Sequence, residues 1–429
     1  MNTSHMPKPN DLFATLLIRC LRMLLIVLFL AAVSVSHAQY QDLEITGGKT
    51  KIDLPFRYTN GFIVVPVVFE NWFPLNFIFD TGAEHTILSQ REITDLLQLE
   101  YRRRFTLIGS DLSREFYAYL VSGINLQAGS VLAKNRSILV LEEDYLRFED
   151  YTGVEIHGIL GADFFRRFVV EIDYRRQVIT LYDPREFEKP ERGFTSATAT
   201  FRKSKPYVFP EVTLRQGDTS TLKLLLDTGA ALPLLINTDS DPGLVLPERV
   251  IPSNLGAGLG GFLRGYQGKV SSLEIPPYQF SSVVTSYQEI MLGTAIDSNR
   301  LDQRNGILGN EILRRFTVIL DYVREEVYLK PNKNYDDEFK VDRSGMLVIA
   351  TGPGLRDFLI YSVIEGSPAY EAGLKPGDEI RRINWVPVSF LTLSSIINRL
   401  QKPSGKRVRI VVRRDNERIK TSFLLRELI

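Results

Sequence analysis

Short apolar runs separated by Asn, Pro and Gly dominate the centre of the chain. The runs "GFIVVPVVFE" (61–70) and "NFIFD" (76–80) are rich in β-branched and aromatic residues, and "LKLLLD" (222–227) has the same character. Runs of this length and composition, bounded by turn-forming residues, predict β-strands. The pattern therefore indicates a mainly β fold.

The β-rich pattern occurs twice. The segment "HGILGADFFRRFVVEIDYRRQVITLY" (157–182) matches "NGILGNEILRRFTVILDYVREEVYLK" (305–330). Asp80 and Asp227 lie 147 positions apart, and Gly158 and Gly306 lie 148 apart. Two matched pairs at nearly one offset predict a duplicated lobe.

Within each repeat, "ILG" is followed by a segment whose apolar spacing predicts a helix of about two turns. We expect the paired arginines at 166–167 and 314–315 to lie on the exposed side of that helix. Each lobe also has a hairpin candidate, at 107–126 and at 255–275. The second hairpin predicts an easily deformed loop because it is rich in glycine, including Gly258, Gly260 and Gly261. Neither a "GK[ST]" sequence nor a helical pattern follows, which argues against a nucleotide site.

A different pattern begins after about residue 333. Residues 333–343 are a polar connector, and 344–429 contain several strand candidates and one helix candidate at 393–403. The length of 429 residues agrees with two or three domains.

Composition excludes several kinds of chemistry. The 52 basic and 51 acidic side chains give no electrostatic reason to expect nucleic acid as a partner. The only cysteine is Cys20, and of the four histidines only His85 and His157 lie outside the leader described below. We interpret His85 as a surface residue of its turn and His157 as a structural hydrogen-bonding residue, in preference to catalytic roles. We expect no cofactor and no metal site, and we interpret the acidic stretch 141–155 as a solvated loop in preference to a cation site.

The N-terminus predicts export. Basic residues precede the apolar stretch "MLLIVLFLAAVSV" (23–35), and Ser36-His37-Ala38 then supplies small residues for cleavage. This pattern predicts a signal peptide over 1–38, a periplasmic or extracellular protein, and no membrane attachment after cleavage. An uncleaved membrane anchor is the alternative.

The doubled Asp-Thr-Gly motif carries the candidate chemistry. An apolar strand that ends in Asp-Thr-Gly places a carboxylate at a tight turn, and a pseudo-two-fold axis between duplicated lobes can bring two such turns together. Two neighbouring carboxyl groups share a proton, so one acts as a base towards water and the other as an acid towards the leaving nitrogen. This chemistry needs no metal, histidine or cysteine.

The sequence "DTGA" at 80–83 and 227–230, each followed by "ILG" at 159–161 and 307–309, resembles the aspartic proteases. The form of the motif is similar to the retropepsin-like branch, with two lobes fused in one chain as in pepsin-like enzymes. The resemblance implies two acid-protease β-barrel lobes, 45–190 and 191–332, related by a pseudo-two-fold axis. It implies that Asp80 and Asp227 are the catalytic dyad.

The same resemblance implies supporting roles around the dyad. The side chains of Thr81 and Thr228 would interlock the two loops, Gly82 and Gly229 would give the loops their shape, and each "ILG" would pack behind its own loop. Pepsin-like enzymes often carry a hydroxyl residue where this chain has Ala83 and Ala230. Without that hydrogen-bond donor the carboxylate form is less favoured, which predicts a weakly acidic to neutral optimum.

The two lobes differ in the segments that would cover a substrate. The first hairpin offers Tyr117 and Tyr119, whereas the second offers the glycine-rich segment. We therefore expect two unequal flaps.

The segment "GSPAYEAGLKPGDEIRRIN" (366–384) resembles PDZ domains of the bacterial protease-associated type. The resemblance implies a β-sandwich with two helices that binds an extended peptide by strand addition. We expect the strand 359–363, the turn 352–357 and the helix 393–403 to form the groove, with these contact residues: Gly354, Leu355, Phe358, Leu359, Ile360 and Ile396.

The sequence thus predicts an exported, monomeric aspartic endopeptidase whose PDZ domain recruits a peptide or protein substrate. One alternative is a catalytically silent peptide-binding protein. Another is an enzyme that cleaves only its own chain or one dedicated partner.

Overall fold

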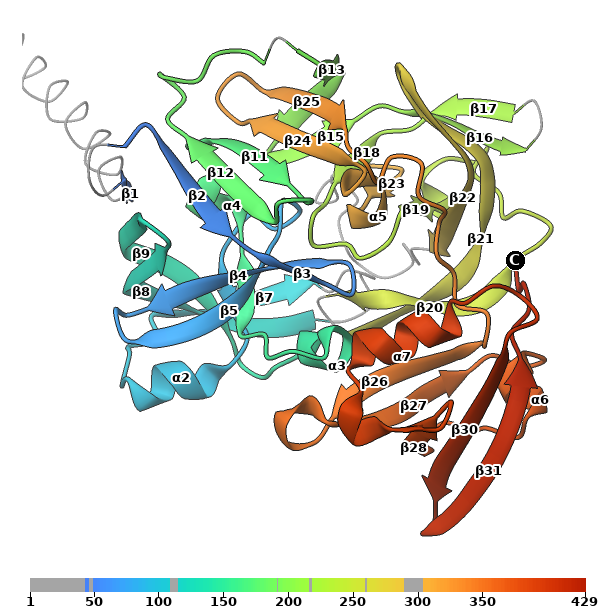
Figure 1. Ribbon diagram of the computed structural model, residues 1–429. Helices are drawn as coiled ribbons and strands as arrows, with labels where there is room; N and C mark the ends of the chain where they lie inside the picture. The colour runs from blue at the N-terminus through green and yellow to red at the C-terminus, as the bar shows by residue number, and fades with distance from the viewer. Residues whose placement is uncertain are drawn as a thin grey trace, which may run out of the picture.

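The computed structural model describes residues 43–45, 49–108, 115–190, 192–215, 218–258, 261–288 and 304–429. The predicted signal peptide and Gly260 lie outside the described residues. The fold is mainly β, as predicted, with two β lobes and a third β unit at the C-terminal end (Figure 1). Over the described part of the chain, no helix is long and apolar enough to cross a membrane.

The first lobe is built on a nine-stranded sheet. Its strand order is β1 (Leu43–Ile45), β9 (Val131–Leu141), β6 (Ile87–Leu88), β10 (Gly158–Leu160), β5 (Phe73–Phe79), β4 (Phe62–Phe69), β8 (Glu115–Ala128) and β7 (Arg103–Ile108), with β3 (Arg57–Thr59) paired to β4. The helices of this lobe are α2 (Arg91–Leu96), α3 (Phe148–Thr152) and α4 (Ala162–Phe165).

The second lobe is built on a ten-stranded sheet. Its order is β14 (Ala199–Arg202), β15 (Lys205–Val208), β18 (Leu224–Leu226), β23 (Gly306–Leu308), β19 (Leu234–Asn237), β22 (Tyr278–Gln288), β21 (Gly261–Ile275), β16 (Glu211–Arg215) and β17 (Asp218–Thr221), with β20 (Ile251–Gly258) paired to β21. The lobe also contains η1 (Thr238–Ser240) and α5 (Asn310–Leu313).

The two lobes repeat one local topology. In the first, β10 runs parallel to β5 and antiparallel to β6. In the second, β23 runs parallel to β18 and antiparallel to β19. Glycine begins both inner strands because a Cβ would lie 2.1 Å from the Ile87 oxygen at Gly158 and 1.9 Å from the Leu235 oxygen at Gly306.

A six-stranded sheet joins the lobes. Its order is β13 (Thr195–Ala197), β25 (Glu326–Pro331), β24 (Phe316–Asp321), β11 (Val169–Asp173), β12 (Val178–Tyr182) and β2 (Lys51–Pro55). Strands β11 and β24, which come from the two copies of the repeat, pair antiparallel from Val169 opposite Asp321 to Asp173 opposite Thr317. One apolar core continues through both lobes, which fixes their relative position.

Two local predictions need correction. The helices after the two "ILG" segments have one turn each and not two. Arg315, expected on an exposed face, is only 1% exposed because it reaches back to the carbonyls of Glu311, Tyr335 and Asp337. The hairpin predicted for the glycine-rich segment of lobe 2 is confirmed, since Ile251–Gly258 pairs with Gly261–Gln267, and its ease of deformation stays a prediction.

The connector after residue 333 packs on the second lobe. The rings of Tyr335 and Phe339 lie 5.2 Å and 6.4 Å from that of Phe280. The polar composition of this segment did not reveal that its two aromatic side chains anchor it.

The C-terminal unit has its own apolar core and a single six-stranded sheet. Its sheet runs β26 (Met346–Thr351), β27 (Asp357–Val363), β28 (Glu379–Ile383), β30 (Arg407–Arg414) and β31 (Glu417–Leu424), with β29 (Val386–Pro387) paired to β28. The helical segments are η3 (Pro353–Leu355), α6 (Pro368–Glu371), η4 (Val388–Phe390) and α7 (Leu393–Leu400).

The order of these strands corrects the predicted peptide groove. Strand β27, which contains Phe358, Leu359 and Ile360, is paired on both sides, with β26 and with β28. It therefore has no free edge for an added strand, and the edge strand beside α7 is β26. The turn with Gly354 and Leu355 follows that edge strand instead of preceding it.

Candidate functional site

Asp80 and Asp227 occupy equivalent places in the two lobes. Asp80 follows β5 and its N–H donates to the Leu160 carbonyl at 3.1 Å, while Asp227 follows β18 and donates to the Leu308 carbonyl at 3.0 Å. Each aspartate is thus held by the "ILG" strand of its own lobe. Both side chains are half-buried.

Each aspartate lies against the glycine of the opposite loop. A Cβ on Gly82 would lie 2.7 Å from Cγ of Asp227, and a Cβ on Gly229 would lie 2.4 Å from Cγ of Asp80. Only glycine leaves room for this approach. The structure therefore brings together two carboxyl groups that lie far apart in the sequence.

Backbone donors hold the carboxyl groups in the loops. Oδ1 of Asp80 accepts from the N–H groups of Gly82 at 2.7 Å and Ala83 at 3.1 Å, and Oδ1 of Asp227 accepts from the N–H of Gly229 at 2.7 Å. Burial raises the pKa of Asp80 well above its usual value, and the charge of Asp227 and a hydrogen bond shared with it raise it further. A proton on Asp80 is therefore retained at a pH where an exposed carboxyl group would lose it.

Two fully buried threonines connect the loops by reciprocal hydrogen bonds. Oγ1 of Thr81 donates to the Leu226 carbonyl at 2.7 Å and accepts from the Thr228 N–H at 3.0 Å. In return, Oγ1 of Thr228 donates to the Phe79 carbonyl at 2.8 Å and accepts from the Thr81 N–H at 3.0 Å. Each hydroxyl is used as donor and acceptor across the lobe interface, so the two loops are fixed relative to each other.

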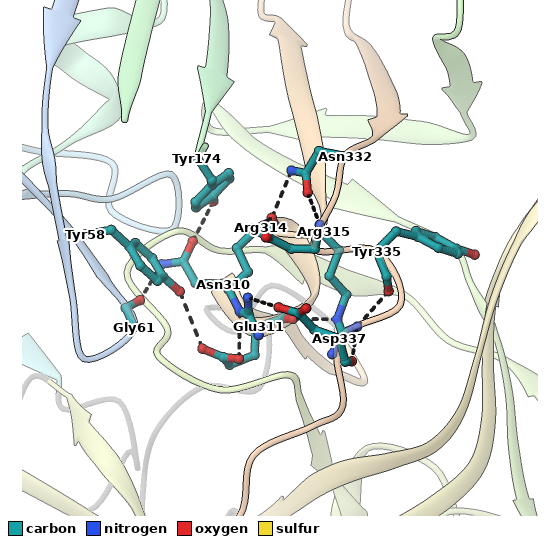
Figure 2. Close-up of polar contacts among 11 residues, drawn as sticks. Tyr58, Gly61, Tyr174, Asn310, Glu311, Arg314, Arg315, Asn332, Tyr335 and Asp337 are labelled. Carbon is teal, nitrogen blue, oxygen red and sulfur yellow. Dashed lines mark hydrogen bonds and ion pairs between the residues drawn. The ribbon is translucent and has the colours of Figure 1, made fainter. Parts of the chain in front are cut away.

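A further polar residue, Asn310, ties the second loop to the first lobe (Figure 2). Its Nδ2 donates to the Gly61 carbonyl at 2.8 Å and to the Thr228 carbonyl at 2.5 Å, and its Oδ1 accepts from the hydroxyl of Tyr174 at 2.6 Å. The equivalent residue of the first repeat is Ala162. Sequence reasoning overlooked Asn310, although the change from Ala to Asn within the repeat was a visible signal.

The network around Asn310 extends along α5. Glu311 accepts a long hydrogen bond of 3.5 Å from the Tyr58 hydroxyl and pairs with Arg314 at 2.9 Å. Figure 2 shows Tyr58 and Tyr174 reaching this helix from the first lobe, and Asp337 from the other side. Burial and the negative Glu311 raise the pKa of Tyr58, so its hydroxyl stays a donor.

The predicted flap residues lie on strands. Tyr119 donates to Oε1 of Glu142 at 2.8 Å, and the Arg104 guanidinium lies 3.7 Å from the ring centre of Tyr117. In lobe 2, Gly258 and Gly261 face each other at the end of the β20–β21 pair. The contact of these hairpins with a substrate stays a prediction.

The remaining titratable candidates have structural partners. Nδ1 of His157 accepts from the Asn76 N–H at 3.2 Å, and His85 is exposed beside Glu84. Within the ranges that the structure describes, no group of three or more His, Cys, Asp or Glu side chains is placed to hold a metal ion.

Two family models match parts of this chain. Residues 65–164 match the family model for aspartyl proteases, and residues 359–414 match the model for PDZ domains. A solved aspartic proteinase from Irpex lacteus aligns at 15% identity and a TM-score of 0.39, covering 67% of this chain and 99% of that one. The resemblance to an aspartyl protease with a PDZ domain is confirmed.

Proposed function

We propose that this protein is an exported aspartic endopeptidase in which Asp80 and Asp227 hydrolyse peptide bonds with a shared proton. The observation that carries this proposal is the close approach of each carboxyl group to the glycine of the opposite loop. Because one chain supplies both aspartates, a monomer is sufficient for activity.

The dyad has the properties that acid-base hydrolysis requires. With the proton on Asp80, the other carboxylate accepts a proton from a water molecule as that water attacks the peptide carbonyl. The proton on Asp80 is first shared with the developing oxyanion, and a carboxyl group of the pair then protonates the leaving nitrogen. The threonine bonds and Asn310 keep the two groups at a fixed separation, which reduces the reorganisation needed during the reaction.

The PDZ domain gives the proposed enzyme a second peptide-binding surface. Domains of this fold bind extended segments by adding a strand to a sheet edge. A substrate held there has a raised effective concentration at the cleft, provided that its length spans the two sites.

The test is cleavage of a diverse peptide mixture by the mature protein from about pH 3 to about pH 8. Products are identified by mass spectrometry, with Asp80→Asn and Asp227→Asn proteins measured alongside. We expect cleavage by the wild type and none by either variant. Cleavage that survives both substitutions would overturn the proposed dyad.

A folded wild type that cuts nothing in the mixture would contradict a general endopeptidase. Mapping the termini of the purified precursor after incubation then separates the alternatives. New termini that are absent in Asp80→Asn indicate an enzyme restricted to its own chain, whereas unchanged termini favour a dedicated partner or a silent peptide-binding protein.

A further inference from the structure

The edge strand of the PDZ domain is covered by the first lobe. Helix α3 of that lobe packs against both β26 and α7, the two elements between which this fold binds peptides (Figure 1). The approach is close at Gly153, the residue after α3, where a Cβ would lie 2.8 Å from Cβ of Leu393 at the start of α7.

The burial of Ile349 supports this cover. Val348 and Ala350 belong to the PDZ core, whereas Ile349, which lies between them on β26, does not. Only 2% of Ile349 is nevertheless exposed. It is therefore buried from outside the domain. On the neighbouring strand β27, Tyr361 lies near Tyr151 of α3. Burial is the main cause that raises the pKa of the Tyr151 hydroxyl, and Tyr361 raises it further.

Helix α3 is itself anchored to the first lobe. The ring of Phe148 makes an edge contact with Phe62 at 5.5 Å between ring centres. Nδ2 of Asn60 donates to the carbonyls of Tyr151 at 3.0 Å and Thr152 at 3.1 Å, which are carbonyls of the last turn of the helix. The cover is therefore a packed element of the protease lobe.

Backbone N–H groups of the loop before β26 already have a hydrogen-bond partner within the protein. In PDZ domains, backbone N–H groups of a loop at the start of the binding strand can receive a terminal carboxylate. Here the carboxylate of Asp342 accepts from the N–H of Ser344 at 3.2 Å and of Gly345 at 2.6 Å, and from the Ser344 hydroxyl at 2.7 Å. The donors that a free C-terminus would use are already satisfied by a side chain of the same protein.

We propose that α3 closes the PDZ groove of the resting protein, and that the groove accepts an extended internal peptide segment, not a free C-terminus, once α3 withdraws. A helix uses its backbone groups internally and cannot add a strand to β26, whereas an extended segment can. An extended ligand therefore gains hydrogen bonds that α3 does not make, which allows it to compete. This inference depends on the PDZ fold alone and not on the proposed peptidase activity.

The test is hydrogen exchange of the full mature chain, read by mass spectrometry over α3 and β26. Gly153→Ala disturbs the contact in two ways, because Gly153 has a φ of 67° and its Cβ would collide with Leu393. The control is Gly123→Ala, at a φ of 87°, where the nearest atom to a Cβ is 3.9 Å away. We expect exchange at both segments to rise at least about fivefold in Gly153→Ala and not in the control.

A second variant loosens α3 without touching the PDZ domain. Asn60→Gly removes both hydrogen bonds to α3 and tolerates the positive φ of 46° at this position. It is expected to raise exchange at β26 as well. Exchange at β26 that stays at the wild-type level in both variants would overturn the inference, provided that the strands β11 and β24 remain protected in each.

The ligand class is tested with random-sequence decapeptides, either amidated or with free carboxyl termini, in an Asp80→Asn background that prevents their cleavage if the dyad is catalytic. We expect both peptide mixtures to protect β26 equally from hydrogen exchange. We also expect half-maximal protection at an about tenfold lower peptide concentration in Gly153→Ala than in the Gly123→Ala control. Protection by the free-carboxyl mixture only would show that a C-terminus is the ligand. If both variants require the same peptide concentration for protection, α3 does not compete with the peptide for the groove.

Discussion

The carboxyl group of Asp80 rests against the backbone of Gly229, so closely that a Cβ on that glycine would lie 2.4 Å from Cγ of Asp80. The contact is reciprocal, because a Cβ on Gly82 would lie 2.7 Å from Cγ of Asp227. The separation of the two aspartates is therefore set by glycines in the opposite loops. Any side chain at either glycine must push one loop away.

Gly229→Ala tests this steric limit. We expect the added methyl group to displace Asp80 and to lower kcat by about 100-fold or more, because a shift of about 1 Å disrupts a catalytic pair. Peptide cleavage is the measurement. Gly243→Ala is the control, since a Cβ there meets only Oδ1 of Asp241 at 3.2 Å, and an equal loss in that variant would contradict the explanation.

Thr81→Val tests the hydrogen bonds between the loops. The substitution keeps the shape of the side chain but leaves the Leu226 carbonyl and the Thr228 N–H without their partner. We expect the free energy of unfolding to fall by about 1–3 kcal/mol in urea denaturation. Thr81→Ser keeps the hydroxyl and should lose less, so equal losses in the two variants would argue against the hydrogen bonds as the cause.

Asn310→Ala tests the tie between α5 and the first lobe. It removes the partner of the Gly61 and Thr228 carbonyls and of the Tyr174 hydroxyl, all in a buried setting. We expect a loss of about 2–4 kcal/mol of unfolding free energy and a lowered kcat, because the Asp227 loop loses one of its connections to the first lobe. Tyr174→Phe removes one of the three hydrogen bonds and should lower the free energy of unfolding by less. A larger loss in Tyr174→Phe than in Asn310→Ala would contradict the role assigned to Asn310.

The pH profile of cleavage depends on the raised pKa of Asp80. A raised pKa means that the shared proton persists to higher pH, so activity should be greatest at weakly acidic to neutral pH and fall as the pH rises through that pKa. Ala83→Ser adds a hydroxyl donor that favours the carboxylate and should move the alkaline limb down by about one pH unit. A wild-type maximum below about pH 4 would contradict the prediction.

Glu149 on α3 gives a pH effect on stability. Burial, with the charges of Asp144 and Asp150, raises its pKa from 4.5 to about 7. Between these two pKa values the unfolded chain loses the Glu149 proton and the folded chain keeps it. The contribution of Glu149 to the free energy of unfolding therefore declines as the pH rises through this window. Glu149→Gln should therefore stabilise by about 1 kcal/mol at pH 8 and have little effect at pH 4, measured by thermal unfolding. The same gain at both pH values would exclude titration as the cause.

Most of the candidate site was predictable because its parts are local. An apolar run before Asp-Thr-Gly is sufficient to predict a strand that ends in a turn, and the repeat indicates that two such turns occur in equivalent lobes. The hydrogen bonds expected of Thr81 and Thr228 are present. Asn310 was overlooked because its three partners come from both lobes, and no local pattern connects them.

The sequence by itself determined the mainly β content, the duplication and the order of the domains, since these follow from periodicity and from motifs a few residues long. The tertiary structure alone decided which strand of the PDZ domain is an edge, that Arg315 is buried, and that α3 covers β26. These features depend on contacts between segments far apart in the chain. Such contacts are set by packing and by strand order, which the local alternation of apolar and polar residues does not specify.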